Sequence, residues 1–433
     1  MEKQNDQNQL KRERPLIAFF DYPDVFEDFY SHYGIDQRTF ATTWANTGSH
    51  SFIKLIQAEI GDVIWYEFSL KPEIKEARHE SVGCRVKFIR SSVFHHLLWK
   101  LFYLPKIAWR WQRFYRAYAT IASYLATTSL SFFKTILKDR PDIIFVQDYA
   151  SGRFDVLVLT AKLLNVPLIA FHTGSPVDRH LAKTVRRWTI RLADCLIASS
   201  RNESELLINR YGVRRERLRV ILTPIDTEIY QPIDRASACE KVSLDSTRRY
   251  FLFIGRLDDD VKRVSAIIRA FSVIAEKHND VDLLIVGDGN DADKLRQLAF
   301  ELAPRGRIKF LGWVTEAETK ARYYNSAECL VLASWREGFP TVVGEAMACG
   351  TPVLSSNVGG VSELVVENKT GWLFEPGDDE ALRAGLDNVL SNPKIVSKMR
   401  PKVRKTAESR VSADAVTANL RDCFLKALKK YDE

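Results

Sequence analysis

Two carboxylates stand eight positions apart in the stretch SWREGFPTVVGEAMACG, which covers residues 334–350. Glu337 lies just before a helix-like run that starts near Thr341, and Glu345 lies inside that run. A carboxylate offers only acceptor oxygens and can hold two hydroxyl groups, so this pair suits a ligand rich in hydroxyls. The helix start between them presents unpaired N–H groups, which favour phosphate. The structural alternative is a helix-capping Glu337 and a solvated Glu345.

Two positive side chains follow an apolar run earlier in the same half of the chain. Arg256 stands directly after residues 250–255, and Lys262 follows six positions later. If the run is a strand of a parallel sheet, Arg256 lies at the edge where ligands bind. Fixed positive charge at such an edge can hold a ligand that carries negative charge. The alternative is a surface salt bridge, and the neighbouring Arg263 is interpreted as a surface residue at a helix start.

The elements that must position these residues alternate between apolar runs and helix-period segments. In the second half the apolar runs cover residues 250–255, 282–287, 308–314, 329–334, 352–357 and 371–374. In the first half, less regularly, they cover residues 16–20, 62–68, 85–89, 142–147, 167–172, 195–199 and 218–222. Continuous apolar strands separated by helices indicate parallel sheets covered on both faces, so the fold class is α/β with doubly wound, Rossmann-like domains.

The chain of 433 residues is 46% apolar, which is enough for two cores. Residues 1–14 are polar and are expected to be a disordered tail without a signal sequence. We expect an N-terminal domain at 15–230, a C-terminal domain at 231–410, a cleft between them, and a terminal helix at 411–433. Residues 223–248 are polar, contain two prolines and are interpreted as a linker.

Five motifs occur in a fixed order along the second half of the chain: FIGRLDDDVKR, LLIVGDG, IKFLGWV, LVLASWREGFPTVVGEAMACGTPVLSSNVGGVSELV and TGWLFEPGD. In this order they resemble the retaining glycosyltransferases of family four. The resemblance is strong over residues 190–391 and weaker over 141–190. It implies the GT-B fold, with two Rossmann-like domains and a C-terminal helix that crosses back onto the first. It also implies a nucleoside-diphosphate sugar as donor, UDP-linked first and GDP-linked next.

The resemblance assigns roles to individual residues. Glu337 would contact the donor sugar, Glu345 the ribose diol and Lys262 the phosphates. The expected catalytic residues are His172, Glu337, Arg256 and Lys262, and a structural role is the alternative for His172, which ends a predicted strand. The expected donor-binding residues are Gly255, Arg256, Lys262, Glu337, Gly338, Phe339, Pro340, Thr341 and Glu345. Pro340 stands where the family more commonly has glycine.

The first domain offers fewer signals for the donor. Gly48 precedes a helix-period run and is a candidate for a phosphate-facing loop. His50, two positions on, could be mistaken for the base of an inverting transferase, but the second domain carries the retaining signature. Acidic runs such as LDDDVK and DADK superficially match a metal motif, yet Arg256 and Lys262 already answer the charge of the diphosphate. We therefore expect no metal and no cofactor.

A basic and aromatic segment at 91–134 bears on the class of acceptor. Residues 85–140 contain eleven Lys and Arg and one acid. An apolar stripe at helical spacing begins at Ile107 and continues through Trp111, Phe114, Tyr118, Ile121 and Leu125. Such a helix is typical of a membrane interface, and an anionic surface would attract its charge. The alternative is that the stripe packs in the core of the domain; no nucleic-acid motif accompanies the charge, so nucleic acid is not an expected partner.

Together these observations predict a cytoplasmic retaining hexosyltransferase, peripheral on the inner face of a membrane, whose acceptor is a lipid or lipid-linked glycan. The alternatives are the same transfer to a soluble acceptor (a small sugar or secondary metabolite), a nucleotide-sugar epimerase of the same fold, and a non-catalytic donor-binding protein. Six scattered cysteines without metal-ligand spacing are expected to be reduced thiols.

Overall fold

The computed structural model describes residues 13–31, 34–44, 48–102, 112–172, 183–304 and 306–432. They divide into two compact units. Unit 1 comprises Met1–Ala198, Ser204–Ile221 and Thr417–Glu433, and unit 2 comprises Ser199–Glu203 and Leu222–Val416. The division falls at residues 221–222 instead of 230–231, because Leu222, Ile225 and Tyr230 pack into the core of unit 2.

Unit 1 contains an eight-stranded sheet in the order β3-β4-β2-β1-β5-β6-β7-β8. Its strands are β1 Leu16–Phe20, β2 Asp62–Ser69, β3 Glu76–Arg78, β4 Arg85–Arg90, β5 Ile143–Gln147, β6 Leu168–Phe171, β7 Cys195–Ala198 and β8 Leu218–Val220. Every pair is parallel except β3 with β4 at one edge. The strands β1, β6 and β7 are apolar throughout and buried, as expected for a parallel sheet that is covered on both faces.

The helices of unit 1 are α1 Phe26–Phe29, α2 Gln37–Thr42, α3 Gly48–Glu59, α4 Val93–Phe102, α5 Gln112–Thr127, α6 Leu130–Asp139, α7 Gly152–Leu164, α8 Lys183–Thr189, most of α9 Arg201–Tyr211, and the greater part of α18 Ala413–Asp432. Alternate strand residues point to opposite faces. The ring of Phe145 on β5 lies 5.4 Å from that of Phe424 on α18, between centroids, and Phe20 on β1 lies 5.9 Å from Phe132 on α6. The terminal helix is thus part of the core of unit 1.

Unit 2 contains six parallel strands in the order β11-β10-β9-β12-β13-β14. They are β9 Arg249–Ile254, β10 Val281–Val286, β11 Ile308–Phe310, β12 Cys329–Leu332, β13 Val353–Ser356 and β14 Gly371–Phe374. Counted from β9, this is the Rossmann order 3-2-1-4-5-6, so the chain reverses direction across the sheet between β9 and β12. Ligands of such sheets bind beyond the carboxyl ends of the strands at this reversal.

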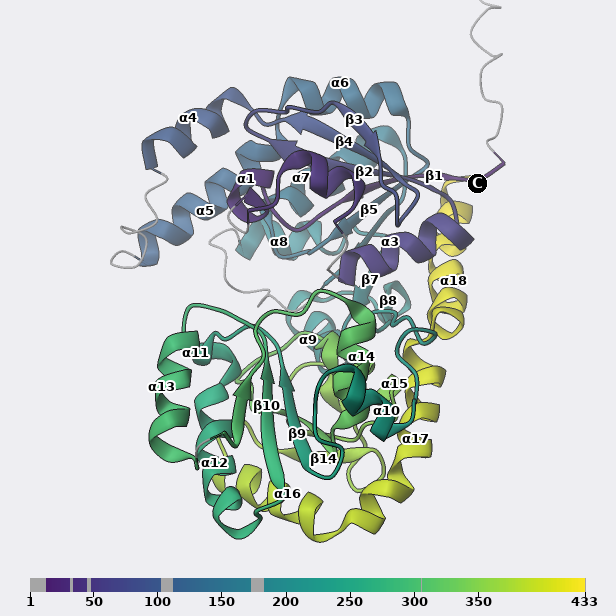
Figure 1. Ribbon diagram of the computed structural model, residues 1–433. Helices are drawn as coiled ribbons and strands as arrows, with labels where there is room; N and C mark the ends of the chain where they lie inside the picture. The colour runs from purple at the N-terminus through teal and green to yellow at the C-terminus, as the bar shows by residue number, and fades with distance from the viewer. Residues whose placement is uncertain are drawn as a thin grey trace, which may run out of the picture. The chain divides into compact units, whose positions relative to one another are not determined.

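The helices of unit 2 are α10 Arg235–Lys241, α11 Asp259–Lys262, α12 Val264–Lys277, α13 Ala292–Leu302, α14 Ala317–Ser326, α15 Thr341–Ala348, α16 Asp379–Ser391 and α17 Pro393–Val411. Helix α12 packs on α13 and α16, while α14 packs on α10 and α15, and α15 packs on α17 (Figure 1). Two helical layers therefore enclose the sheet, as the apolar strands require.

The segment at 223–248 is not a linker, which corrects the sequence prediction. It contains α10, capped by the Asp234 side chain, which accepts a hydrogen bond from the Ser237 N–H at 2.9 Å. Ala238 and Cys239 on this short helix are buried against unit 2. The polar composition of the segment reflects its exposed face, because one turn of buried residues is too short for a periodicity to be recognised.

The expectation of six reduced thiols is also wrong in the structure. Cys195 on β7 and Cys423 on α18 form a disulfide, and their Cα atoms are 6.8 Å apart. A separation of 228 residues hides this pair from any spacing argument. The other four cysteines, Cys84, Cys239, Cys329 and Cys349, are buried thiols.

His50 lies in an aromatic core of unit 1, with its ring centroid 4.8 Å from that of Trp65 and 5.5 Å from that of His79. Burial, followed by the charge of His79, lowers its pKa to about 3. The imidazole is therefore neutral in the folded protein at neutral pH and is a weak proton acceptor there.

The buried imidazole of His50 should make stability depend on pH. Its folded pKa lies below its unfolded value of 6.5, so the stabilisation is complete above pH 6.5 and is lost as the pH falls towards 3. Between pH 7 and 5 we expect a loss of about 2 kcal/mol of unfolding free energy from this group. Urea unfolding at both pH values measures it. The loss should shrink in His50→Leu and persist in His278→Gln of unit 2; an unchanged pH dependence in His50→Leu would contradict this account.

Candidate functional site

Lys262 and Glu337 meet at the strand reversal of unit 2. Lys262 ends α11, which follows β9, and Glu337 lies in the loop after β12, the neighbouring strand. The Nζ atom of Lys262 is 2.6 Å from Oε1 of Glu337, and the two side chains are 18% and 10% exposed. Two residues that are 75 positions apart thus form a largely buried ion pair where a Rossmann sheet binds its ligand.

The Glu337 carboxylate is held by further contacts. The Ser334 hydroxyl donates a hydrogen bond to its Oε1 at 2.6 Å. The backbone of Glu337 and Gly338 is pressed against the loop after β13, where the Gly360 N–H donates to the Gly338 carbonyl at 2.6 Å. A Cβ on Gly359, whose φ is +54°, would lie 2.2 Å from the carbonyl oxygens of both residues. Gly359 therefore allows the two loops to meet, a positioning role that no spacing in the sequence predicts.

Two arginines stand on either side of Lys262 in the sequence. Arg256 follows Gly255 directly after β9, and its side chain is exposed. Arg263, at φ +52°, places its guanidinium 4.4 Å from the centroid of the Trp335 ring and 2.6 Å from Asp379. Arg263 is therefore not a simple surface residue, because it anchors the loop that carries Glu337.

Glu345 is buried in α15, where it faces α14. The Tyr324 hydroxyl donates a hydrogen bond to its Oε2 at 2.8 Å, and the Lys320 ammonium lies 3.8 Å from its Oε1. Burial, followed by the charge of Glu345, raises the pKa of Tyr324 well above its usual value, so this phenol stays a donor. The structure thus contradicts the alternative in which Glu345 is solvated. A carboxylate with two contacts keeps lone pairs for further hydroxyls.

The start of α15 lies between the two glutamates. Pro340 precedes its first residue, Thr341, and no side chain caps the helix. Phe339 is buried beside Gly344 and Gly360, whereas Gly338 and Thr341 are half-buried. The orphan N–H groups of this first turn remain available to an anion, which rules out a helix-capping role for Glu337 here.

His172 belongs to unit 1 and follows β6. It is buried, stacks on the Tyr149 ring at 4.8 Å between centroids, and places Nε2 3.7 Å from Oδ1 of Asp148. Asp148 adopts φ +78° and follows β5, the neighbouring strand. His172 therefore lies at the carboxyl edge of its own sheet, where the sequence predicts it, and its part in catalysis stays a prediction.

Gly48 is the first residue of α3, beside a buried polar cluster at the carboxyl edge of the unit 1 sheet. The next residue, Ser49, donates its hydroxyl to Asp21 at 3.3 Å and also bonds Gln147. The Tyr30 hydroxyl bonds the same Asp21 carboxylate. The phosphate role of Gly48 stays a prediction, and the residues around it are ones that the sequence reasoning missed.

Arg153 and Glu67 complete this cluster. The Arg153 side chain is 1% exposed and donates to the carbonyl oxygens of Asp21 and Asp24, the latter at 2.6 Å. Burial raises the pKa of Asp21, and burial together with Asp21 raises that of Glu67 well above its usual range. Oε2 of Glu67, Nε of Arg153 and both ring nitrogens of His95 are buried without a hydrogen-bond partner in the described chain. Such atoms call for a polar ligand or water.

The basic and aromatic segment is described only in part. Residues 103–111, which include Ile107, Trp109 and Trp111, lie outside the described residues. In the described part of α5, Ala122 and Ala126 are buried, whereas Ile121 is exposed and Leu125 half-buried. The apolar stripe therefore does not pack in the core of the domain at Ile121.

Neighbouring helices also expose apolar side chains. On α4, Val93, Phe94 and Leu97 are 77%, 72% and 55% exposed, and on α6, Leu130 and Leu137 are exposed. Within the described residues, no helix is both long enough and apolar enough to cross a bilayer. No group of three metal-ligating side chains gathers in that part of the chain.

The two doubly wound units, with a ligand edge at a strand reversal, define the class: this is an α/β protein of the GT-B fold. Residues 234–410 match the family model described as glycosyl transferases group 1, and residues 110–229 match that of glycosyltransferase family 4. The two matches together cover 297 of the 433 residues, which is most of unit 2 and about half of unit 1. The chain belongs to the group 1 and family 4 glycosyltransferases.

Relatives and solved structures agree with this assignment. A D-inositol 3-phosphate glycosyltransferase of Rhodococcus jostii is 27% identical over 58% of this chain and 56% of its own, so the chain spans little more than half of that relative. Sucrose-phosphate synthase of Thermosynechococcus elongatus has the same fold, with a TM-score of 0.73 at 20% identity over 96% of this chain and 100% of its own. HepE of Anabaena, solved with UDP, has a TM-score of 0.69 at 17% identity over 94% of this chain and 98% of its own.

Proposed function

We propose that this protein is a retaining hexosyltransferase that uses a nucleoside-diphosphate sugar, with UDP as the preferred carrier. The observation that carries the proposal is the buried Lys262–Glu337 pair at the strand reversal. Among the similar structures, HepE was solved with UDP and with UDP-glucose. The donor diphosphate would lie against Lys262, Arg256 and the start of α15, with its sugar hydroxyls on Glu337.

In the proposed reaction the bond between the anomeric carbon and the diphosphate oxygen breaks, and the acceptor hydroxyl oxygen bonds to the same face of that carbon. The proton of that hydroxyl passes to the departing diphosphate oxygen. Negative charge develops on the leaving diphosphate, where Lys262 and Arg256 stabilise it electrostatically. Glu337 orients the sugar, Glu345 binds the ribose, and His172 assists at the positively charged anomeric centre. The arrangement needs no metal ion to neutralise the diphosphate.

We infer that the acceptor is a lipid or lipid-linked glycan at an anionic membrane surface on the cytoplasmic side. The apolar side chains exposed on α4, α5 and α6 support this, because Lys100 is exposed on α4 and Lys134 and Lys138 are exposed on α6. Exposed apolar groups beside lysines match the chemistry of a bilayer interface. The second candidate is a soluble acceptor, which the name of the inositol phosphate relative favours; the third is an epimerase of the same fold.

Release of UDP from UDP-hexoses, measured with and without acceptor extracts, tests the proposed reaction. Acceptor-dependent release, with an NMR spectrum showing the donor's anomeric configuration in the product, is expected. Release that needs no acceptor and yields an isomerised sugar nucleotide indicates the epimerase. Partition of the labelled product into organic solvent separates the lipid acceptor from the soluble one.

Replacement of Val93 and Phe94 by serine should weaken binding to vesicles that contain anionic lipid. Each side chain would lose roughly 1.5–3 kcal/mol of apolar burial, so the partition coefficient should fall about tenfold or more. Vesicle flotation measures it. Leu163→Ser is the matched control, since Leu163 is exposed on α7 and not on α4, α5 or α6. Wild-type protein that fails to float with anionic vesicles would exclude the membrane surface.

A further inference from the structure

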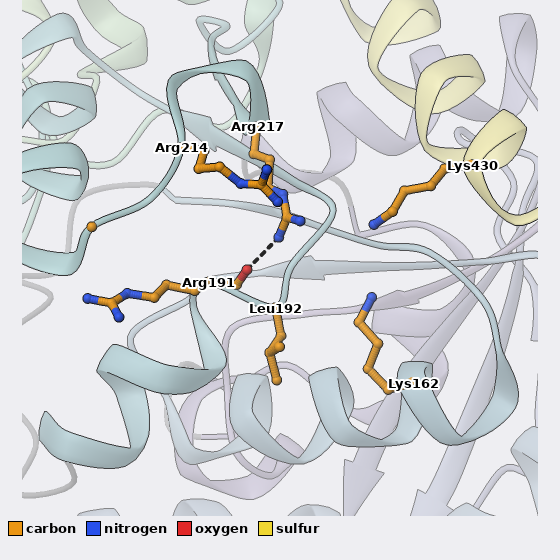
Figure 2. Close-up of a pocket in the computed structure, with 7 residues that line it drawn as sticks. Lys162, Arg191, Leu192, Arg214, Arg217 and Lys430 are labelled. Atoms are coloured by element: carbon orange, nitrogen blue, oxygen red, sulfur yellow. Dashed lines mark hydrogen bonds between the residues drawn. The ribbon is translucent and has the colours of Figure 1, made fainter.

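A basic pocket lies in unit 1 on the edge of the sheet opposite to His172. Asp194, beneath it, directly precedes β7, and Arg217 directly precedes β8, whereas His172 follows the end of β6. The pocket has a volume of about 300 Å³, and its lining residues are Lys162, Arg191, Leu192, Gly212, Arg214, Arg217 and Lys430 (Figure 2). It is therefore separate from the residues to which the proposed transfer assigns a role in unit 1.

Two lysines from different elements meet over one buried carboxylate. Lys162 lies in the last turn of α7 and Lys430 in the last turn of α18, and their ammonium groups point toward one another in Figure 2. Asp194, 1% exposed at its side chain, lies 3.1 Å from Lys162 Nζ and 2.6 Å from Lys430 Nζ. Burial opposes ionisation of Asp194, but hydrogen bonds from Lys430 and the Leu168 N–H keep its pKa below the usual value. One carboxylate thus fixes two cations and neutralises only one.

The arginines are oriented by neutral groups. Arg217 donates to the carbonyls of Arg191 and Ala193, the latter at 3.2 Å, and Arg191 donates Nε–H to the Tyr211 carbonyl at 2.6 Å. In the described chain, no carboxylate forms an ion pair with Arg191 or Arg217. Arg214 pairs with Glu216 at 3.2 Å, but both side chains are largely exposed, so that pair contributes little. The carbonyl contacts thus orient the guanidinium groups of Arg191 and Arg217 but do not neutralise their positive charge.

Gly212 makes room for one of these guanidinium groups. Its φ is +67°, and a Cβ there would lie 2.8 Å from an Nη atom of Arg191. The backbone turn and the position of Arg191 therefore depend on glycine. The positive lining is thus fixed by several local contacts instead of being a chance gathering of long surface side chains.

We propose that this pocket is a second ligand site that binds a phosphate-bearing anion. Guanidinium forks match phosphate oxygens in pairs, and ammonium groups add point charges. The volume exceeds what one phosphate group fills, so a sugar phosphate or a phospholipid headgroup fits the same chemistry. The site also includes the last turn of α18, since Lys430 lines the pocket and the neighbouring Tyr431 bonds Lys162 and Asp194. An anion that offsets the Lys162–Lys430 repulsion would stabilise the last turn of α18.

Calorimetric titration with inorganic pyrophosphate tests the site. The Arg191→Gln/Arg214→Gln double variant should bind pyrophosphate at least tenfold more weakly at the pocket, because it loses two guanidinium charges. The variant should still fold, because both side chains are exposed and neither pairs with a buried acid. The matched control is Arg215→Gln, on the same loop but outside the pocket, which should bind as wild type. The proposed donor site in unit 2 should also bind pyrophosphate. Binding at the pocket is therefore identified as the component of the titration that disappears in the double variant and remains in Lys262→Met.

A second measurement distinguishes the source of the phosphate. Reduced flotation of the double variant with phosphatidylglycerol vesicles identifies a lipid headgroup, and unchanged flotation with lost pyrophosphate binding identifies a free phosphate ligand. Pyrophosphate should also slow hydrogen exchange at the end of α18 in the wild type. Equal pyrophosphate binding by wild type and double variant, or an equal loss in Arg215→Gln, would overturn the proposal. If Lys262→Met loses glycosyl transfer but keeps pyrophosphate binding at the pocket, the two sites are independent.

Discussion

Glu337→Gln should lower kcat/KM for the nucleotide sugar by about 100-fold or more, with kcat carrying most of the change. Glutamine keeps the size of the side chain but removes the charge that pairs with Lys262 at 2.6 Å and replaces one acceptor oxygen by a donor. A sugar hydroxyl that donates to Glu337 would then face an N–H group. Initial rates of nucleoside diphosphate release over a range of donor concentrations separate kcat from KM.

Lys262→Met should cause a comparable loss, and the double variant should lose much less than the product of the two single effects. Residues in direct contact are not additive, and removal of either partner already disrupts the pair. Lys294→Met is the control, because Lys294 forms an exposed surface pair with Asp291 in the same unit. Wild-type kcat in Glu337→Gln, with a folded protein, would remove Glu337 from the reaction and with it our assignment of the donor site.

The donor half of the fold was predictable because its strands are continuous and bounded. The apolar runs predicted to begin at residues 250, 282, 308, 329, 352 and 371 form the strands β9 to β14, and each strand begins within one residue of its predicted start. A buried parallel strand must be apolar on both faces, so it is a continuous apolar run that differs from the periodic pattern of the neighbouring helices. The edge strand β3 was missed because it has three residues, two of them charged, and is only partly buried.

The polar cluster of unit 1 was invisible for a different reason. Asp21, Glu67 and Arg153 are single polar residues at or after separate strands and in a helix, and no spacing connects them. Only the strand order, which places β2, β1 and β5 side by side, brings them together. The Cys195–Cys423 pair and the basic pocket share this property, since both join α18 to residues more than 200 positions earlier. Sequence patterns report local periodicity, whereas these sites are made by long-range topology.

Arg153→Met should destabilise unit 1 by about 3–5 kcal/mol, the usual cost of leaving buried acids without their cation. Arg153 holds the carbonyls of Asp21 and Asp24, and its charge lies near the buried carboxyls of Asp21 and Glu67. Without the guanidinium, the two carboxyls lose a neutralising positive charge, and they can offset that loss only by binding protons.

The loss in Arg153→Met should therefore depend on pH. The pKa values of Asp21 and Glu67 are already raised in the folded state, chiefly by burial, and should rise further in the variant. A raised acid pKa contributes stability at low pH that is lost as the pH rises through the folded value, so the difference from wild type should be larger at pH 8 than at pH 5. Urea unfolding at the two pH values measures it, with Arg90→Met, exposed at the end of β4, as the control. A loss that is equal at both pH values would assign Arg153 to packing and not to charge.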